Sequence, residues 1–60
     1  SASIYKEQFL IKALLVDIEA GRELMIQVGL EEGFTSENTI VISQSIDQLL
    51  NQLKEASTAD

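Results

Sequence analysis

The chain has 60 residues, with ten acidic side chains against four basic ones and a formal net charge of −6. A domain of this size buries only about 60% of its unfolded surface, so its stability must come from well-packed helices or from oligomerisation. The acidic balance argues against nucleic acid and anionic membranes as partners, because both are bound through clustered Lys and Arg. The absence of Cys and His excludes disulfides, thiolate zinc sites and the usual general base near neutral pH.

No apolar run reaches the roughly 18 residues that span a bilayer. The first residues also lack the basic segment and long apolar stretch that are typical of a signal peptide. We therefore expect a cytoplasmic protein.

Apolar side chains recur at helical spacing from about residue 4 to residue 29, which predicts a long amphipathic helix. The predicted stripe consists of Ile4, Ile11, Leu15, Ile18 and Met25, with Leu14 and Val28 beside it. Gly21 lies inside this helix and costs up to ~1 kcal/mol relative to Ala. Either a close contact with another helix or simple tolerance explains this glycine.

A loop is expected at about residues 30–35. Gly29 or Gly33 can adopt the left-handed conformation that ends a helix. Leu30 and Phe34 are expected to pack back over this end of the hairpin. Thr35 or Ser36 can then cap a new helix, and an acid in its first turn, Glu37, suits the helix dipole.

The second helix is predicted over about residues 36–55, and residues 56–60 are predicted to form a frayed polar tail. Its apolar stripe consists of Ile42, Ile46, Leu49, Leu50 and Leu53. A short loop makes the two helices antiparallel neighbours, so the predicted fold is all-α: a single helical-hairpin domain over residues 1–60. The longer first helix is expected to overhang the second at residues 4–10.

The apolar content exceeds what one hairpin can bury. The first helix alone carries Phe9, Leu10, Leu14, Leu15 and Val16, which cover more than one narrow stripe. Two hairpins that pair into a four-helix bundle would cover the surplus, which predicts a homodimer. A partner protein that covers the same surface is the alternative.

Polar residues gather on one flank of the second helix. Gln44, Asp47 and Asn51 share this flank with an apolar neighbour, Ile40, and Ser43 lies between the flank and the apolar stripe. Side chains three apart on a helix are about one turn from each other, so Gln44 and Asp47 can act on the same group. Solubility is the common role of such residues, and a contact patch is the alternative interpretation.

The stretch Ser43-Gln44-Ser45-Ile46-Asp47 resembles the signature S-Q-x-L-D of the sporulation-associated aspartyl-phosphate phosphatases, the stage-zero sporulation protein E family of spore-forming bacilli. The resemblance covers about residues 11–54. A first helix similar to residues 18–25, a short turn, a Thr-Ser helix start and the signature follow one another in the same order. Ile46 stands where the pattern usually has Leu, a change that conserves volume and should face the core.

The resemblance implies that the chain hydrolyses the aspartyl phosphate of a sporulation response regulator and thereby represses entry into sporulation. Asp47 matches the acid linked to activity. Gln44 is expected to orient the attacking water, and Asp47 to pair with the regulator's lysine or to bind the water, although these two roles can be exchanged. Ser43, Ile40 and Asn51 are expected to contact the regulator. No cofactor or metal site of the chain's own is implied, since the regulator supplies Mg²⁺.

Two rival interpretations come from other classes. A non-catalytic dimerisation or anti-activator hairpin would explain the acidity and the apolar surplus equally well, and it would act stoichiometrically. A metal-binding hairpin would use Glu31, Glu32 and Glu37, but this loop lacks the alternating ligands and final Glu of a calcium loop. Its acids better fit capping and solubility.

Overall fold

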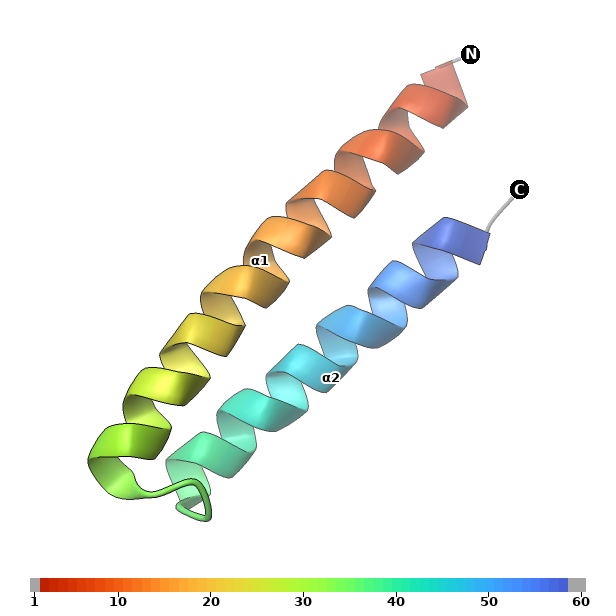
Figure 1. Cartoon of the computed structure of the whole chain (residues 1–60). Coiled ribbons are helices and arrows are strands. Elements are labelled where there is room, and N and C mark those ends of the chain that lie inside the picture. The colour runs from red at the N-terminus through yellow and green to blue at the C-terminus, as the bar shows by residue number, and fades with distance from the viewer. Residues whose placement is uncertain (1, 59–60) are drawn as a thin grey trace.

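The computed structural model describes residues 2–58, which form two α-helices: α1 (Ala2–Glu32) and α2 (Glu37–Thr58). The helices run antiparallel and lie side by side as one hairpin (Figure 1). The long dimension of 46 Å equals the length of α1, because 31 helical residues rise by about 1.5 Å each. The predicted all-α hairpin is confirmed.

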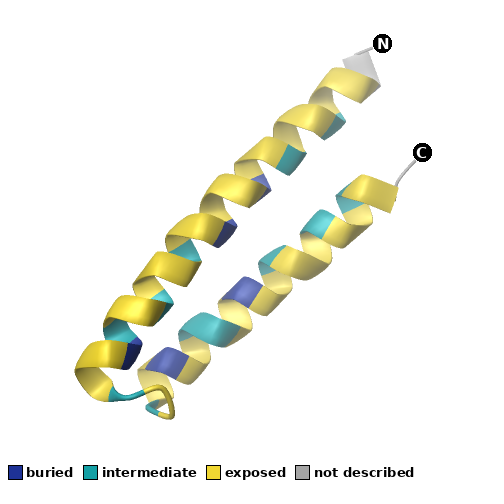
Figure 2. Cartoon of the chain, viewed as in Figure 1, coloured by how far each residue is buried: buried dark blue, intermediate teal, exposed yellow. Residues whose placement is uncertain are grey.

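One narrow seam joins the helices, and the buried residues lie on the sides of α1 and α2 that face each other (Figure 2). Apart from Gly29 and Ser43, which lie beside the seam, the buried and half-buried positions of each helix are spaced alternately by three and four residues. This is the heptad spacing of coiled coils, in which each helix contributes two positions per seven residues. The seam of α1 consists of Glu7, Ile11, Leu14, Ile18, Gly21, Met25 and Val28, and that of α2 consists of Thr39, Ile42, Ile46, Leu49, Leu53 and Ala56.

Gly21 and Ile46 fix the register of the seam. A Cβ added at Gly21 would stand only 3.1 Å from Cγ1 of Ile46, so the glycine accommodates the isoleucine and simple tolerance is not its explanation. An antiparallel course in this register brings the other seam positions level in pairs: Val28 with Thr39, Met25 with Ile42, Ile18 with Leu49, Leu14 with Leu53, and Ile11 with Ala56. In the same register Thr58, the last described residue of α2, lies level with residue 9, so the N-terminal turns of α1 overhang the described part of α2 as predicted (Figure 1).

The predicted stripe on the first helix was wrong at two positions. Leu14 is buried, whereas Leu15 and Ile4 are exposed. Either leucine satisfies helical spacing between Ile11 and Ile18, and only the partner helix decides which of them faces inward. On α2 the stripe is confirmed except for Leu50, which lies at the edge of the seam and is exposed.

The first helix ends at Glu32, beyond the predicted boundary near residue 29, and Gly33 caps it. Gly33 has φ of +98°, and its N–H donates to the carbonyl of Gly29 at 2.8 Å, which is the single-bond left-handed cap. Gly29 itself is helical and buried, and a methyl group added there would overlap the ring of Phe34. Phe34 thus packs against this end as predicted, but Leu30 does not: it is 75% exposed.

Ser36 caps the N-terminus of α2, and Thr39 forms hydrogen bonds both to this cap and to the turn. The Thr39 N–H donates to Ser36 Oγ at 3.2 Å, and the Thr39 hydroxyl donates to the Gly33 carbonyl at 2.8 Å. Since a hydroxyl has one hydrogen, the 2.8 Å contact between the two hydroxyls must be donated by Ser36. The connection is therefore only residues 33–36, shorter than the predicted loop.

The second helix continues past its predicted end. Ala56, Ser57 and Thr58 are helical, so the prediction of a frayed tail is wrong for these three residues. The Ser57 and Thr58 hydroxyls donate to the carbonyls of Leu53 and Lys54 four residues back, a local bond that Ser and Thr commonly make within a helix. The rest of the predicted tail, residues 59–60, lies outside the described residues.

Candidate functional site

The candidate site is the middle of α2, where the signature residues divide between the two sides of the helix. Ile46 is 7% exposed and packs into the seam opposite Gly21, as its place in the pattern predicted. This contact holds the turn that carries the signature at a fixed position along α1. The residues on either side of Ile46 are then directed outward by helix geometry.

Gln44 and Asp47 are both exposed on the outer side of α2. They lie three residues apart, so their Cβ atoms are separated by about 5–6 Å. Neither side chain makes a hydrogen bond or an ion pair within residues 2–58, where the one ion pair joins Arg22 to Glu19 at 3.4 Å. Amide and carboxylate are therefore free to engage groups of another molecule.

The predicted neighbours occupy the same flank. Ile40 and Asn51 are exposed on the outer side, and Ser43 is half-buried between this flank and the seam. The five predicted residues thus form one continuous strip along α2. Ser43 has no activating base: the chain lacks His, and Lys54 is the lysine of α2. These surroundings do not support a nucleophilic serine.

Val41 and Gln48 also border the site, although neither was predicted to belong to it. They lie three residues before and four residues after Gln44, and both are exposed. The Ser45 hydroxyl, which lies between them, donates to the Val41 carbonyl at 3.1 Å. Helical spacing alone could have found both residues, since positions three and four apart are neighbours on a helix surface.

The remaining surface offers no enclosed site within the described residues. The surface of the described hairpin has no pocket, and no three acidic side chains of the described residues converge as a metal ion would require. Neither helix, as far as the structure describes it, is long and apolar enough to cross a membrane. An open convex helix face can complete a site only together with a partner that supplies the cavity.

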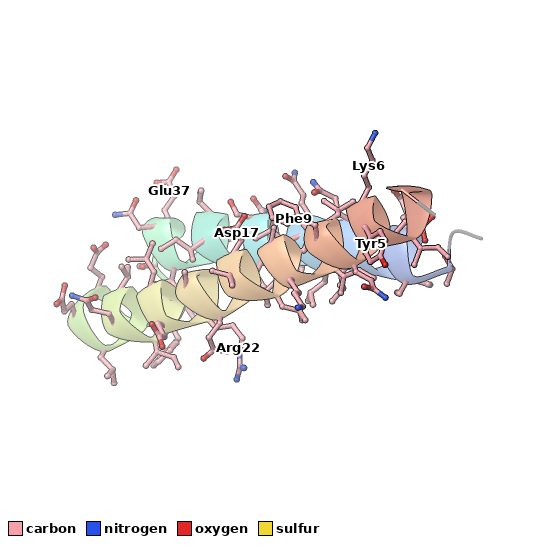
Figure 3. The ribbon with its side chains drawn as sticks, turned by 90° about the horizontal axis from the view of Figure 1, so that it is seen from above. Tyr5, Lys6, Phe9, Asp17, Arg22 and Glu37 are labelled. Atoms are coloured by element: carbon pink, nitrogen blue, oxygen red, sulfur yellow. The ribbon has the colours of Figure 1, made fainter. Side chains whose placement is uncertain are left out.

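Side chains project from every side of the hairpin (Figure 3). Arg22 points to one side of it, whereas Lys6 and Glu37 point to the other (Figure 3). Arg22 bonds its own neighbour Glu19 one turn back, and both side chains are about 60% exposed. This pair contributes little to stability, because exposed ion pairs on one helix typically give only ~0.3–0.5 kcal/mol.

One sequence family matches this chain. Its description is "Spo0E like sporulation regulatory protein", and the match covers residues 14–54, which includes most of the seam, the turn and the whole strip from Ile40 to Asn51. No curated protein and no solved structure matches the chain significantly. Since the match spans well over half of the sequence, the chain belongs to the Spo0E-like family of sporulation regulatory proteins.

Proposed function

We propose that this sporulation regulator is a phosphatase that hydrolyses the aspartyl phosphate of a sporulation response regulator and so represses sporulation. The observation that carries the proposal is the pair Gln44 and Asp47, one turn apart, exposed and unengaged on a helix face within the family match. A response regulator as substrate also implies a cytoplasmic site of action.

The proposed reaction requires only a modest rate acceleration from the chain. The oxygen of water attacks phosphorus, the bond from phosphorus to the carboxylate oxygen breaks, and the products are free aspartate and inorganic phosphate. The regulator contributes Mg²⁺ and a lysine. A hundred- to thousandfold acceleration requires only ~3–4 kcal/mol, which alignment of one water molecule and placement of one charge can supply.

Two side chains have roles in this proposal. The Gln44 amide orients the attacking water, and the Asp47 carboxylate pairs with the regulator's lysine or accepts a hydrogen bond from the water. The opposite assignment of these two roles is equally consistent with their positions. Ser43, Ile40 and Asn51 contact the regulator around them.

Replacement of the acid tests the proposal. Asp47→Ala should lower the turnover of phosphorylated regulator by about 100-fold or more while the helix content stays the same, because Asp47 is exposed. Asp17→Ala, which removes an exposed acid from α1, is the matched control and should keep full turnover. A folded Asp47→Ala protein with wild-type turnover would exclude the proposed mechanism.

We also propose that two hairpins associate through the outer side of α1. Phe9, Val16 and Leu30 share one heptad position there and are 76%, 68% and 75% exposed. The chain exposes 4696 Å², whereas a compact monomer of 6.6 kDa should expose about 3,900 Å². The excess is close to the roughly 800 Å² that each partner buries in a standard interface.

This association leaves the outer side of α2 free for the regulator, because it uses the opposite side of the hairpin. Sedimentation of the wild-type chain should give the mass of a dimer, and a Phe9→Ser/Val16→Ser chain should sediment as a monomer. A wild-type monomer at every concentration would refute the dimer without affecting the proposed phosphatase activity.

A further inference from the structure

The middle of the outer side of α2 carries few charges, and Glu37 and Glu55 lie near the two ends of the helix. Of the ten acids, only Asp47 lies between residues 38 and 53, and no Lys or Arg lies there either. Glu37 and Lys54 stand at the two ends of this stretch. Residues 38–53 thus carry a net charge of −1, whereas residues 2–37 carry −4, from seven acids against three basic residues.

Gln44 is surrounded on the helix surface by four side chains: Ile40, Val41, Asp47 and Gln48. Ile40 and Val41 are 46% and 54% exposed, so two apolar side chains border the amide on the side toward the turn. On the other side the border consists of one carboxylate and one amide. Apolar and amide groups with a single charge are typical of a contact surface rather than of a surface kept only for solubility.

The expected partner presents a negatively charged surface to α2. An aspartyl-phosphate pocket contains the phosphoryl oxygens and the carboxylates that hold its divalent cation, so its mouth is rich in anionic oxygen. Further acids on a docking helix would repel this pocket, since like charges brought together at an interface cost binding free energy. Amide N–H groups, in contrast, can donate to phosphoryl oxygens.

We infer that Val41 and Gln48, together with Ile40, form the docking surface for the phosphorylated pocket of the regulator, and that the lack of further acids on this surface is a determinant of partner affinity. The inference rests on the partner named in the proposed function. It adds two contact residues, Val41 and Gln48, and the requirement that the docking surface carry no further acids. Ile40 and Val41 exclude water at the rim, and Gln48 donates to the pocket beside Asp47.

A pair of isosteric substitutions tests the requirement for no further acids. Gln48→Glu adds one acid to the docking surface, and Gln27→Glu adds the same acid to an exposed position of α1. We would measure binding of each chain to the regulator loaded with Mg²⁺ and beryllofluoride, a mimic of its phosphorylated state, and KM and kcat with the phosphorylated regulator.

Gln48→Glu should raise Kd and KM by about 10-fold with little change in kcat, whereas Gln27→Glu should change either by less than about twofold. Gln48→Lys should bind within about threefold of the wild type or more tightly, which separates charge from the loss of the amide. Val41→Ser should also raise KM rather than lower kcat.

The outcomes separate this inference from the proposed function. Equal effects of Gln48→Glu and Gln27→Glu would overturn the docking surface, while turnover by the wild type would still support the phosphatase. The expected order of Kd values without any turnover would support the docking surface and refute the phosphatase. No binding of the wild type to the loaded regulator would overturn both.

Discussion

The two sides of α2 differ in composition and in what they do. The inner side carries Ile46, which packs against Gly21, and the buried Thr39, whose hydroxyl donates a hydrogen bond to the Gly33 carbonyl in the turn. The outer side carries Gln44 and Asp47, which bond nothing within the described chain. The difference shows that one short signature packs one residue against α1 and exposes an amide and a carboxylate beside it. Stability and activity should therefore respond to different substitutions.

Ile46→Ala should have the largest effect on stability. Truncation of a buried Ile leaves a cavity opposite Gly21 and should cost ~2–4 kcal/mol of unfolding free energy, a large part of what a 60-residue chain has. Urea unfolding followed by circular dichroism measures this cost.

Ile40→Ala is the matched control, since the same residue type is 46% exposed six positions earlier. Its cost should stay below about 1 kcal/mol. Similar costs for the two substitutions would contradict the division of α2 into an inner and an outer side.

Thr39→Val should have an intermediate effect. The substitution keeps the shape but removes the hydroxyl that donates to the Gly33 carbonyl at 2.8 Å and accepts from Ser36, in a residue that is 3% exposed. Unpaired polar groups at the turn should cost ~1–2 kcal/mol in thermal or urea unfolding.

Thr58→Val provides the comparison for this substitution, because the Thr58 hydroxyl also bonds backbone carbonyls but is exposed to water. We expect a loss within about 0.5 kcal/mol there. An equally small loss of unfolding free energy in Thr39→Val would show that the hydroxyl network at the turn does not stabilise the hairpin.

Gln44→Ala should have the smallest effect on stability, within about 0.5 kcal/mol, because its side chain is exposed and unbonded. Turnover at saturating phosphorylated regulator should nevertheless fall by about 10-fold, since one water-orienting group is lost. Gln52→Ala, at another exposed position of α2, should leave turnover unchanged. Normal turnover of Gln44→Ala would remove this amide from the chemistry.

The sequence predicted the hairpin and the buried side of α2 because the apolar residues of α2 are few enough to define one stripe. The same reasoning failed on α1, where Leu14 and Leu15 fit helical spacing equally well and only packing against α2 selects Leu14. The helix boundary was also misplaced, because Gly29 and Gly33 can both end a helix and only Gly33 adopts positive φ.

The position of the candidate site was predictable, and its function only in part. Helical spacing alone places Gln44, Asp47, Asn51 and Ile40 on the outer flank, and the structure confirms that all four are exposed. Periodicity cannot assign chemistry to an exposed amide and acid, because these groups gain their role only beside the phosphoryl group of another molecule. The family match supplies the regulatory context, and catalysis stays a prediction.

The most direct test of the central claim is turnover below one equivalent. We would incubate the chain at one-tenth equivalent with a phosphorylated sporulation response regulator and follow the loss of the phosphoryl label. The account predicts complete loss, with many phosphoryl groups released per chain. Loss that stops at one-tenth, or that does not exceed the regulator's own decay, would contradict it and favour a helical module that acts by occupancy.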